Sequence, residues 1–170
     1  MDLPIGRRLV ETRRSGPFDS DCDGFDCEAG EDANAVYFNV CIGTMEVDFS
    51  EVHSHCVAGG YDGVSLPVSA SENSHIFDLS TQVWANRPVS NYSIRLGGTD
   101  VATEGLWLHD RTGVPMSYFN WPPNASEPNN GGIGEHCINM IGDLNYGGLW
   151  QDLGCEKPSN AGYAWSCEKR

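Results

Sequence analysis

The sequence lacks the local motifs that hydrolytic enzymes need. There is no His-Glu-x-x-His zinc motif, no Gly-x-Ser-x-Gly nucleophile turn and no cysteine–histidine pattern of a cysteine protease. Two Cys-x-x-Cys units, which would form a zinc knuckle, are also missing. We therefore expect a protein that is not an enzyme and whose cysteines do not bind zinc.

Long hydrophobic runs and basic side chains are scarce as well. No apolar stretch approaches the ~20 residues of a membrane span, and the first residues lack the apolar run of a signal peptide, so we expect any leader to have been removed. Lysine and arginine total 10 against 24 aspartates and glutamates, which gives a formal net charge of −14. This charge repels phosphate backbones and anionic lipids. We expect neither nucleic acid nor a membrane surface as a partner, and cations are favoured.

Cysteine, glycine and proline are what the chain does contain. Seven cysteines without a zinc pattern indicate disulfides and an oxidising compartment. The sequons at Asn91 and Asn124 are compatible with secretion. With 39% hydrophobic residues the chain can bury one sizeable core, while 20 glycines and 9 prolines favour a loop-rich fold. We expect a secreted, extracellular protein.

The chain divides into an N-terminal extension, residues 1–26, and one domain, residues 27–170. The first 18 residues are polar and show no period. Residues 19–32 carry seven acidic side chains and no basic one, which we interpret as a turn-rich acidic loop. Its beginning resembles a calcium-binding EF-hand loop, but the twelfth position is Gly30 where an EF-hand needs glutamate. A solvated acidic turn is the favoured interpretation.

Two helices are predicted in the first half of the domain. The first follows Thr44 as N-cap and ends at Gly59-Gly60, and the second begins with a capping box of Ser69 and Glu72 and ends before Pro88. Their apolar positions are Met45, Phe49, Val52 and Cys56 in the first helix and Ile76, Leu79 and Val83 in the second.

Short strands separated by long loops are predicted elsewhere. The expected strands are Val36 to Phe38, Ser93 to Leu96, Leu106 to Leu108, His136 to Met140, Leu149 to Leu153 and Tyr163 to Cys167. Two helices followed by several short strands indicate an α+β domain.

Oxygen-bearing side chains gather in two segments, residues 121–137 and 149–155. A hard cation such as Ca²⁺ takes six to eight oxygen ligands. The side chains that offer such oxygens are Glu127, Asn129, Glu135, Gln151 and Asp152. A cis bond before Pro128 would direct the side chains of Glu127 and Asn129 to the same side. We expect these residues to bind calcium.

The order of these motifs resembles a C-type lectin domain over about residues 27–170. The resemblance rests on the helix cysteine, Glu-Pro-Asn at 127–129, Gly-Glu-x-Cys at 134–137, Trp-x-Asp at 150–152 and Trp-Ser-Cys-Glu at 165–168. It implies a C-type lectin-like fold, with two helices, small antiparallel sheets and a long calcium-binding loop region. It also implies a calcium ion that coordinates two adjacent sugar hydroxyls. The implied ligands are Glu127, Asn129, Glu135 and Asp152, with Gln151 where the family usually has asparagine.

The same resemblance implies a ligand class. The Glu-Pro-Asn form is similar to mannose-type sites, which accept the equatorial vicinal hydroxyls of mannose, N-acetylglucosamine, glucose or fucose. The implied function is that of a secreted calcium-dependent lectin. Gln151 departs from the pattern, because its extra methylene changes the calcium cage or moves the amide donor.

Further family features are implied at other positions. Asp100 and Glu104 resemble an auxiliary calcium site, although His136 stands where an acidic partner is expected. The long form of the family pairs Cys27 with Cys41, Cys56 with Cys167, and Cys137 with Cys155. Cys22 is then left over, which indicates a free thiol or a disulfide-linked homo-oligomer.

An alternative function stays open. Gln151, the acidic loop and the unpaired Cys22 are also compatible with an extracellular interaction or matrix protein that uses a lectin-like fold without binding sugar. Ice or mineral binding on the same scaffold is not excluded by the sequence.

Overall fold

The computed structural model describes residues 26–43, 49–85, 92–132, 134–156 and 162–170. Within these ranges the α-helices are α1 (Phe49–Ala58) and α2 (Ala70–Trp84), and a short 3₁₀ helix, η1, covers Leu144–Tyr146. The strands are β1 (Asp26–Glu31), β2 (Tyr37–Gly43), β3 (Gly63–Val64), β4 (Tyr92–Thr99), β5 (Leu108–His109), β6 (Cys137–Ile141), β7 (Trp150–Leu153) and β8 (Gly162–Lys169).

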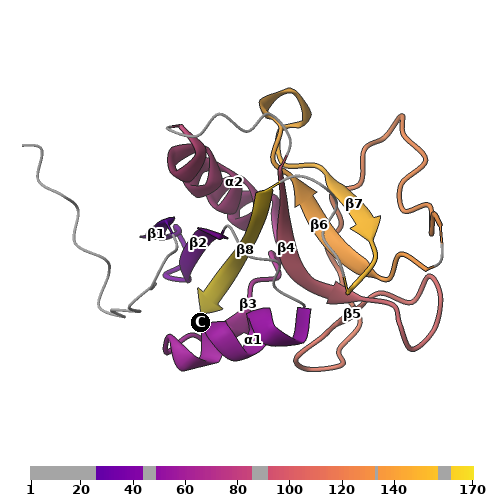
Figure 1. Ribbon diagram of the computed structural model, residues 1–170, viewed down its shortest axis with the longest axis horizontal. Coiled ribbons are helices and arrows are strands. Elements are labelled where there is room, and N and C mark those ends of the chain that lie inside the picture. Colours follow the sequence, from indigo (N-terminus) through magenta and orange to yellow (C-terminus); the bar gives the residue numbers. More distant parts are fainter. Residues whose placement is uncertain (1–25, 44–48, 86–91, 133, 157–161) are drawn as a thin grey trace, which may run out of the picture.

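All of these strands belong to one mixed sheet. Its hydrogen-bonded order is β1-β2-β8-β4-β6-β7, with β3 paired to β8 and β5 paired to β4. The pairs are antiparallel except β4 with β8, which run parallel. Figure 1 shows both helices on one side of the molecule and the long connections around β5, β6 and β7 on the other. The long connections therefore lie away from the helices, which pack against the sheet and cover the core.

The second predicted helix is confirmed at its N-cap. The Ser69 hydroxyl accepts a hydrogen bond from the Glu72 backbone N–H at 3.2 Å, as a capping residue does. The Glu72 carboxylate accepts from the Val68 N–H at 3.0 Å, one residue before the expected partner. The predicted apolar stripe of α2, from Ile76 to Val83, is buried in the main core together with Phe38 and Trp150. This core joins α2 to the sheet.

A second, smaller core lies between α1 and β8. It contains Val52, Cys56, Val64, Trp165 and Cys167 among its buried residues. The Cys56–Cys167 disulfide links the helix to the last strand across 111 residues of sequence. The predicted first helix is thus confirmed over residues 49–58, while its proposed N-cap, Thr44, lies outside the described residues.

The interpretation of residues 19–32 as a turn-rich loop is wrong for residues 26–31. These residues form β1, which pairs with β2 in an antiparallel register that places Cys27 opposite Cys41. Gly30 is the position where β1 crosses α2, because a Cβ added there would lie 3.2 Å from His75 Nε2. Gly30 allows this close approach to His75, and an edge strand held by its ladder and a disulfide does not require alternating apolar residues.

The other predictions have clear outcomes. All three implied disulfides, Cys27–Cys41, Cys56–Cys167 and Cys137–Cys155, are present. Of the strand predicted at residues 106–108, only Leu108 belongs to a strand, and β3 was not predicted. Cys22 and Asn91 lie outside the described residues. None of the described helices combines the length and the hydropathy needed to cross a membrane.

A buried group of charges, the C-terminal charge network, closes the domain beside α2. Glu168 and Glu72 are 0% and 2% exposed. Arg170 lies 2.9 Å from Glu72 and 3.1 Å from Glu168, and Arg111 lies 3.0 Å from Glu168. Burial alone would raise the pKa of Glu168, but the contacts with His109, Arg170 and the Leu66 N–H together lower it. These carboxylates are matched by cations of the chain itself.

Candidate metal and ligand site

The long connection between β5 and β6 is anchored by aromatic rings. The ring of Trp121 lies 5.4 Å from that of Trp107 and 5.8 Å from that of Trp150, measured between centroids. Trp107 and Trp150 are buried in the main core. Trp121 therefore fixes the start of the segment that carries the predicted ligands, six residues before Glu127.

Asp152 is the point where this segment meets the sheet. It lies on β7 beside Trp150 and is 2% exposed. Its Oδ1 accepts the Asn129 backbone N–H at 2.9 Å, and its Oδ2 accepts the Asn130 N–H at 2.7 Å. The Cys137–Cys155 disulfide links the start of β6 to the segment that follows β7. The structure thus brings Asp152 to the loop, although 23 residues separate it from Asn129.

Glu127 and Asn129 lie together on this loop. The Glu127–Pro128 peptide bond is cis, as predicted, and the Asn129 side-chain amide donates to Glu127 Oε1 at 2.9 Å. The second oxygen, Glu127 Oε2, is buried and has no hydrogen-bond partner. Burial and, next, the neighbouring Asp152 raise the pKa of Glu127 to about 7. The Glu127 carboxylate therefore has one buried oxygen that is available to a ligand.

Glu135 completes the group from the other end of the loop. Its Oε2 accepts the Gly131 N–H at 2.9 Å. A Cβ added to Gly131 would lie 2.6 Å from Asn129 Oδ1 and 2.8 Å from Glu135 Oε2. The two oxygens therefore converge on the same side of Gly131, and any side chain at that position would force them apart.

The structure does not bring Gln151 into this group. Its amide nitrogen donates to Ser93 Oγ on β4 at 3.0 Å. Side chains alternate along a strand, so Gln151 leaves β7 on the face opposite to its buried neighbours Trp150 and Asp152. The amide would have to leave Ser93 before it contacted the other predicted ligands.

The group of Glu127, Asn129, Glu135 and Asp152, here called the loop carboxylate site, carries no compensating cation among the described residues. Among the described residues, no lysine or arginine forms an ion pair with its three carboxylates. Carboxylate and amide oxygens are the donors that a hard cation prefers. The unpartnered Glu127 oxygen and the converging Asn129 and Glu135 oxygens therefore fit a calcium ion.

Asn130 is a functional residue that the sequence analysis missed. It has a positive φ of 47°, which asparagine tolerates better than most residues. Its Oδ1 accepts the Glu135 N–H at 3.0 Å, and its amide donates to Glu104 Oε2 at 2.6 Å. Asn130 thus connects the loop carboxylate site to Glu104. The signal available in the sequence was its place in an Asn-Asn-Gly-Gly turn.

The predicted auxiliary pair is brought together with His136. Donor atoms of Asp100, Glu104 and His136 all lie within 4.8 Å of one another. Asp100 is buried, His136 is half-buried and Glu104 is exposed. The two predicted carboxylates thus face an imidazole.

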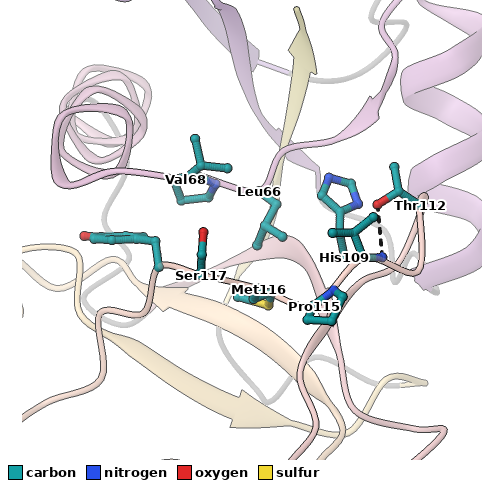
Figure 2. A pocket seen from close by; sticks show the side chains of 10 residues that line it. Leu66, Val68, His109, Thr112, Pro115, Met116 and Ser117 are labelled. Carbon is teal, nitrogen blue, oxygen red and sulfur yellow. Dashed lines mark hydrogen bonds between the residues drawn. The ribbon is translucent and has the colours of Figure 1, made fainter.

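A separate apolar pocket of about 260 Å³ lies between the segment before α2 and residues 109–118. Figure 2 shows Leu66 and Val68 on one side of it and Pro115 and Met116 on the other. Val68 at its edge and Val114 are 51% and 58% exposed. The pocket offers apolar contact and no group of metal ligands.

Comparison with known proteins places the fold. No family model matches the chain. Pulmonary surfactant-associated protein D of Bos taurus is 32% identical over 110 residues, which are 65% of this chain and 26% of that protein. The low affinity immunoglobulin epsilon Fc receptor of Mus musculus is 39% identical over 74 residues, 44% of this chain and 19% of that protein. The chain spans about a quarter or less of these relatives.

Solved structures show the same arrangement. The cow C-type carbohydrate-recognition domain of CD23, determined with GlcNAc2Man3 oligosaccharide, has a TM-score of 0.58 and 21% identity over 79% of this chain and 87% of its own. The C-type lectin CEL-I from Cucumaria echinata has a TM-score of 0.59 and 18% identity over 84% and 94%. A Ca²⁺-dependent type II antifreeze protein has a TM-score of 0.60 and 17% identity over 85% and 98%.

The fold is therefore the C-type lectin-like fold, an α+β domain, as the sequence predicted. The similarity in sequence supports a C-type lectin domain. The expectation that the chain is not an enzyme agrees with these fold neighbours, two of which are named as C-type lectin carbohydrate-recognition domains.

Proposed function

We propose that this chain is a calcium-dependent carbohydrate-binding domain for mannose-type sugars. The observation that carries the proposal is the loop carboxylate site. Glu127 lies beside Asp152 and Asn129, and Glu135 lies at the other end of the loop near the Asn129 side-chain oxygen. In the part of the chain that the structure describes, no lysine or arginine forms an ion pair with these carboxylates. Like charges this close repel, so the site favours a divalent cation.

Calcium would be held by the side chains of Glu127, Asn129, Glu135 and Asp152. Asp152 is fixed by the backbone N–H groups of Asn129 and Asn130, and Glu135 by that of Gly131. Four protein residues leave coordination positions open, because calcium takes six to eight oxygen ligands. Two adjacent hydroxyls of a sugar suit these positions.

The amide and carboxylates beside the ion would orient the sugar. A hydroxyl on the metal still donates one hydrogen bond and accepts another, so it requires an acceptor such as Glu127 or Glu135 and a donor such as the Asn129 amide. Equatorial vicinal hydroxyls, as in mannose, N-acetylglucosamine, glucose or fucose, suit this arrangement. The similarity to a domain determined with GlcNAc2Man3 oligosaccharide supports the same ligand class.

Gln151 would join these ligands only at a cost. Its amide has to give up the hydrogen bond to Ser93, and its side chain has to cross to the face of Asp152. The four other residues therefore carry the proposal, which does not need Gln151 as a ligand.

Calorimetry with the purified chain tests this function. Calcium is titrated first, and methyl mannoside is then titrated with calcium and again with a chelator. Asp152→Asn is expected to weaken calcium binding at least about 10-fold, while Asp143→Asn, on the β6–β7 connection, leaves it unchanged. If the wild-type chain binds neither calcium nor the sugar, the proposal is wrong.

A protein-interaction domain is the second candidate, and the apolar pocket beside Val68 and Val114 favours it. Since an antifreeze protein shares this fold, sugar binding rests on the loop residues and not on the fold. A glycan array that stays blank in calcium, together with a protein partner that is lost in Val114→Asp, would favour this candidate over the lectin.

The setting of the domain is also part of the proposal. Three disulfides and the similarity to extracellular lectins support an extracellular, secreted protein in which the lectin domain covers residues 27–170. Residues 1–26 would form an extension, and Cys22 would link two chains. Comparing the mass with and without reductant tests this link.

A further inference from the structure

The auxiliary cluster does not fit the calcium ion that the lectin resemblance implies. Calcium takes six to eight oxygens and disfavours imidazole. Here the side-chain donors are two carboxylates and the His136 ring. The neighbouring Asn130 turns its amide N–H groups toward Glu104, and its oxygen is used by the Glu135 N–H. The cluster therefore lacks the oxygen count of a calcium site.

We propose that Asp100, Glu104 and His136 bind Zn²⁺. Zinc accepts a mixed set of imidazole nitrogen and carboxylate oxygen, with three protein ligands and one position open to water. His136 Nδ1 lies 3.0 Å from Asp100 Oδ1 and 3.5 Å from Glu104 Oε2. Ligand bonds of about 2.0–2.2 Å in a tetrahedron separate the donors by roughly 3.3–3.6 Å. Small side-chain movements would therefore admit the ion.

The fold holds two of the three ligands in place. Thr99 on β4 pairs with Cys137 on β6, so the next residue along β4 and the preceding residue on β6 are neighbours. The Asp100 N–H donates to the His136 carbonyl at 3.2 Å, and the Thr99 hydroxyl donates to the same carbonyl at 2.8 Å. The Gly105 N–H fixes Asp100 Oδ2 at 2.8 Å. Such outer contacts orient metal ligands and sustain affinity.

The third ligand gives the ion access. The Glu104 side chain is 56% exposed and that of His136 is 32% exposed, whereas the Asp100 side chain is fully buried. An ion can thus enter from solvent and meet a buried carboxylate at the base of the cluster. This arrangement does not require sugar or calcium at the loop carboxylate site.

Calorimetry with zinc chloride tests the proposal on the chelator-treated full chain held in excess calcium. One zinc ion per chain is expected, and His136→Asn is expected to weaken its binding by more than about 10-fold. His53→Asn, on α1, is the matched control and should leave zinc binding unchanged. Cobalt(II) supplies a second readout, because its visible absorption reports a site with nitrogen and oxygen ligands.

His136→Asp sharpens the test, since it makes the side-chain donors all oxygen. We expect this variant to lose zinc affinity, and thermal unfolding compared with the wild type verifies that it folds. Zinc binding that is absent, that survives His136→Asn, or that is lost in His53→Asn overturns the proposal, and the three residues then form an ion pair only. Calcium and sugar titrations of the same samples separate this outcome from failure of the lectin proposal.

Discussion

The C-terminal charge network and the loop carboxylate site both place carboxylates close together, but they balance the charge differently. Glu72 and Glu168 are buried against Arg170 and Arg111. Glu127, Glu135 and Asp152 have only backbone N–H groups and the Asn129 amide as partners. The pKa of Glu168 is lowered, whereas burial and Asp152 raise the pKa of Glu127 to about 7.

The difference indicates that the first group of carboxylates stabilises the fold, whereas the second is suited to binding a cation. Where the chain supplies its own cations, carboxylates hold the last strand and α2 together. Where it supplies none, the charged form is destabilised until an external cation arrives. Arg111 and Arg170 neutralise the carboxylates of the first region, and we propose that a metal ion neutralises those of the second.

The largest effect is expected when the internal network is broken. Glu168→Ala leaves Arg170, Arg111 and the Leu66 N–H without their buried partner. Removing one member of a buried pair costs about 3–5 kcal/mol, so the free energy of unfolding should fall by about 3 kcal/mol in denaturant titrations. Glu31→Ala, on an exposed side chain, is the control. A change below about 1 kcal/mol would show that the network does not stabilise the fold.

Acid should weaken the same network gradually. The pKa of Glu168 is lower in the folded state than its ordinary value of 4.5. Its contribution to stability is therefore complete above that value and is lost as the pH falls through the lowered pKa. The midpoint temperature of thermal unfolding should fall in this acidic range for the wild type, and it should fall less for Glu168→Gln. If the unfolding temperatures of the two proteins depended on pH in the same way, the acid sensitivity would not come from Glu168.

Removal of a carboxylate at the loop carboxylate site is expected to raise the stability of the metal-free fold. Glu127→Gln removes the charge that burial and Asp152 destabilise, so the chelator-treated protein should become more stable at neutral pH or above. Because Glu127 is partly exposed, solvent screens its repulsion from Asp152, and the free energy of unfolding should rise by only about 1 kcal/mol. Calcium binding should be lost in the same variant. A variant less stable than the wild type in chelator would show that Glu127 is structurally satisfied without metal.

The smallest effect is expected at Gln151. Because its amide donates to Ser93, Gln151→Ala should change calcium affinity by less than about 3-fold. Isothermal titration of both proteins with calcium measures this. A loss as large as that of Asp152→Asn would mean that Gln151 leaves Ser93 and ligates the ion.

The sequence predicted those features whose cause is local. Ser69 and Glu72 mark the start of α2 by their spacing, and the Glu-Pro-Asn segment indicates the cis bond. Strand β1 escaped prediction although it forms a hairpin with β2, because its acidic side chains and Gly30 do not show the apolar pattern of a strand. The direction of Gln151 likewise depends on Ser93, 58 residues away.

The most direct test is a crystal structure of the chain grown in excess calcium. We expect one ion bound by Glu127, Asn129, Glu135 and Asp152, with solvent or sugar hydroxyls in its remaining positions. Glu127 and Asp152 turned apart, with no ion between them, would contradict it.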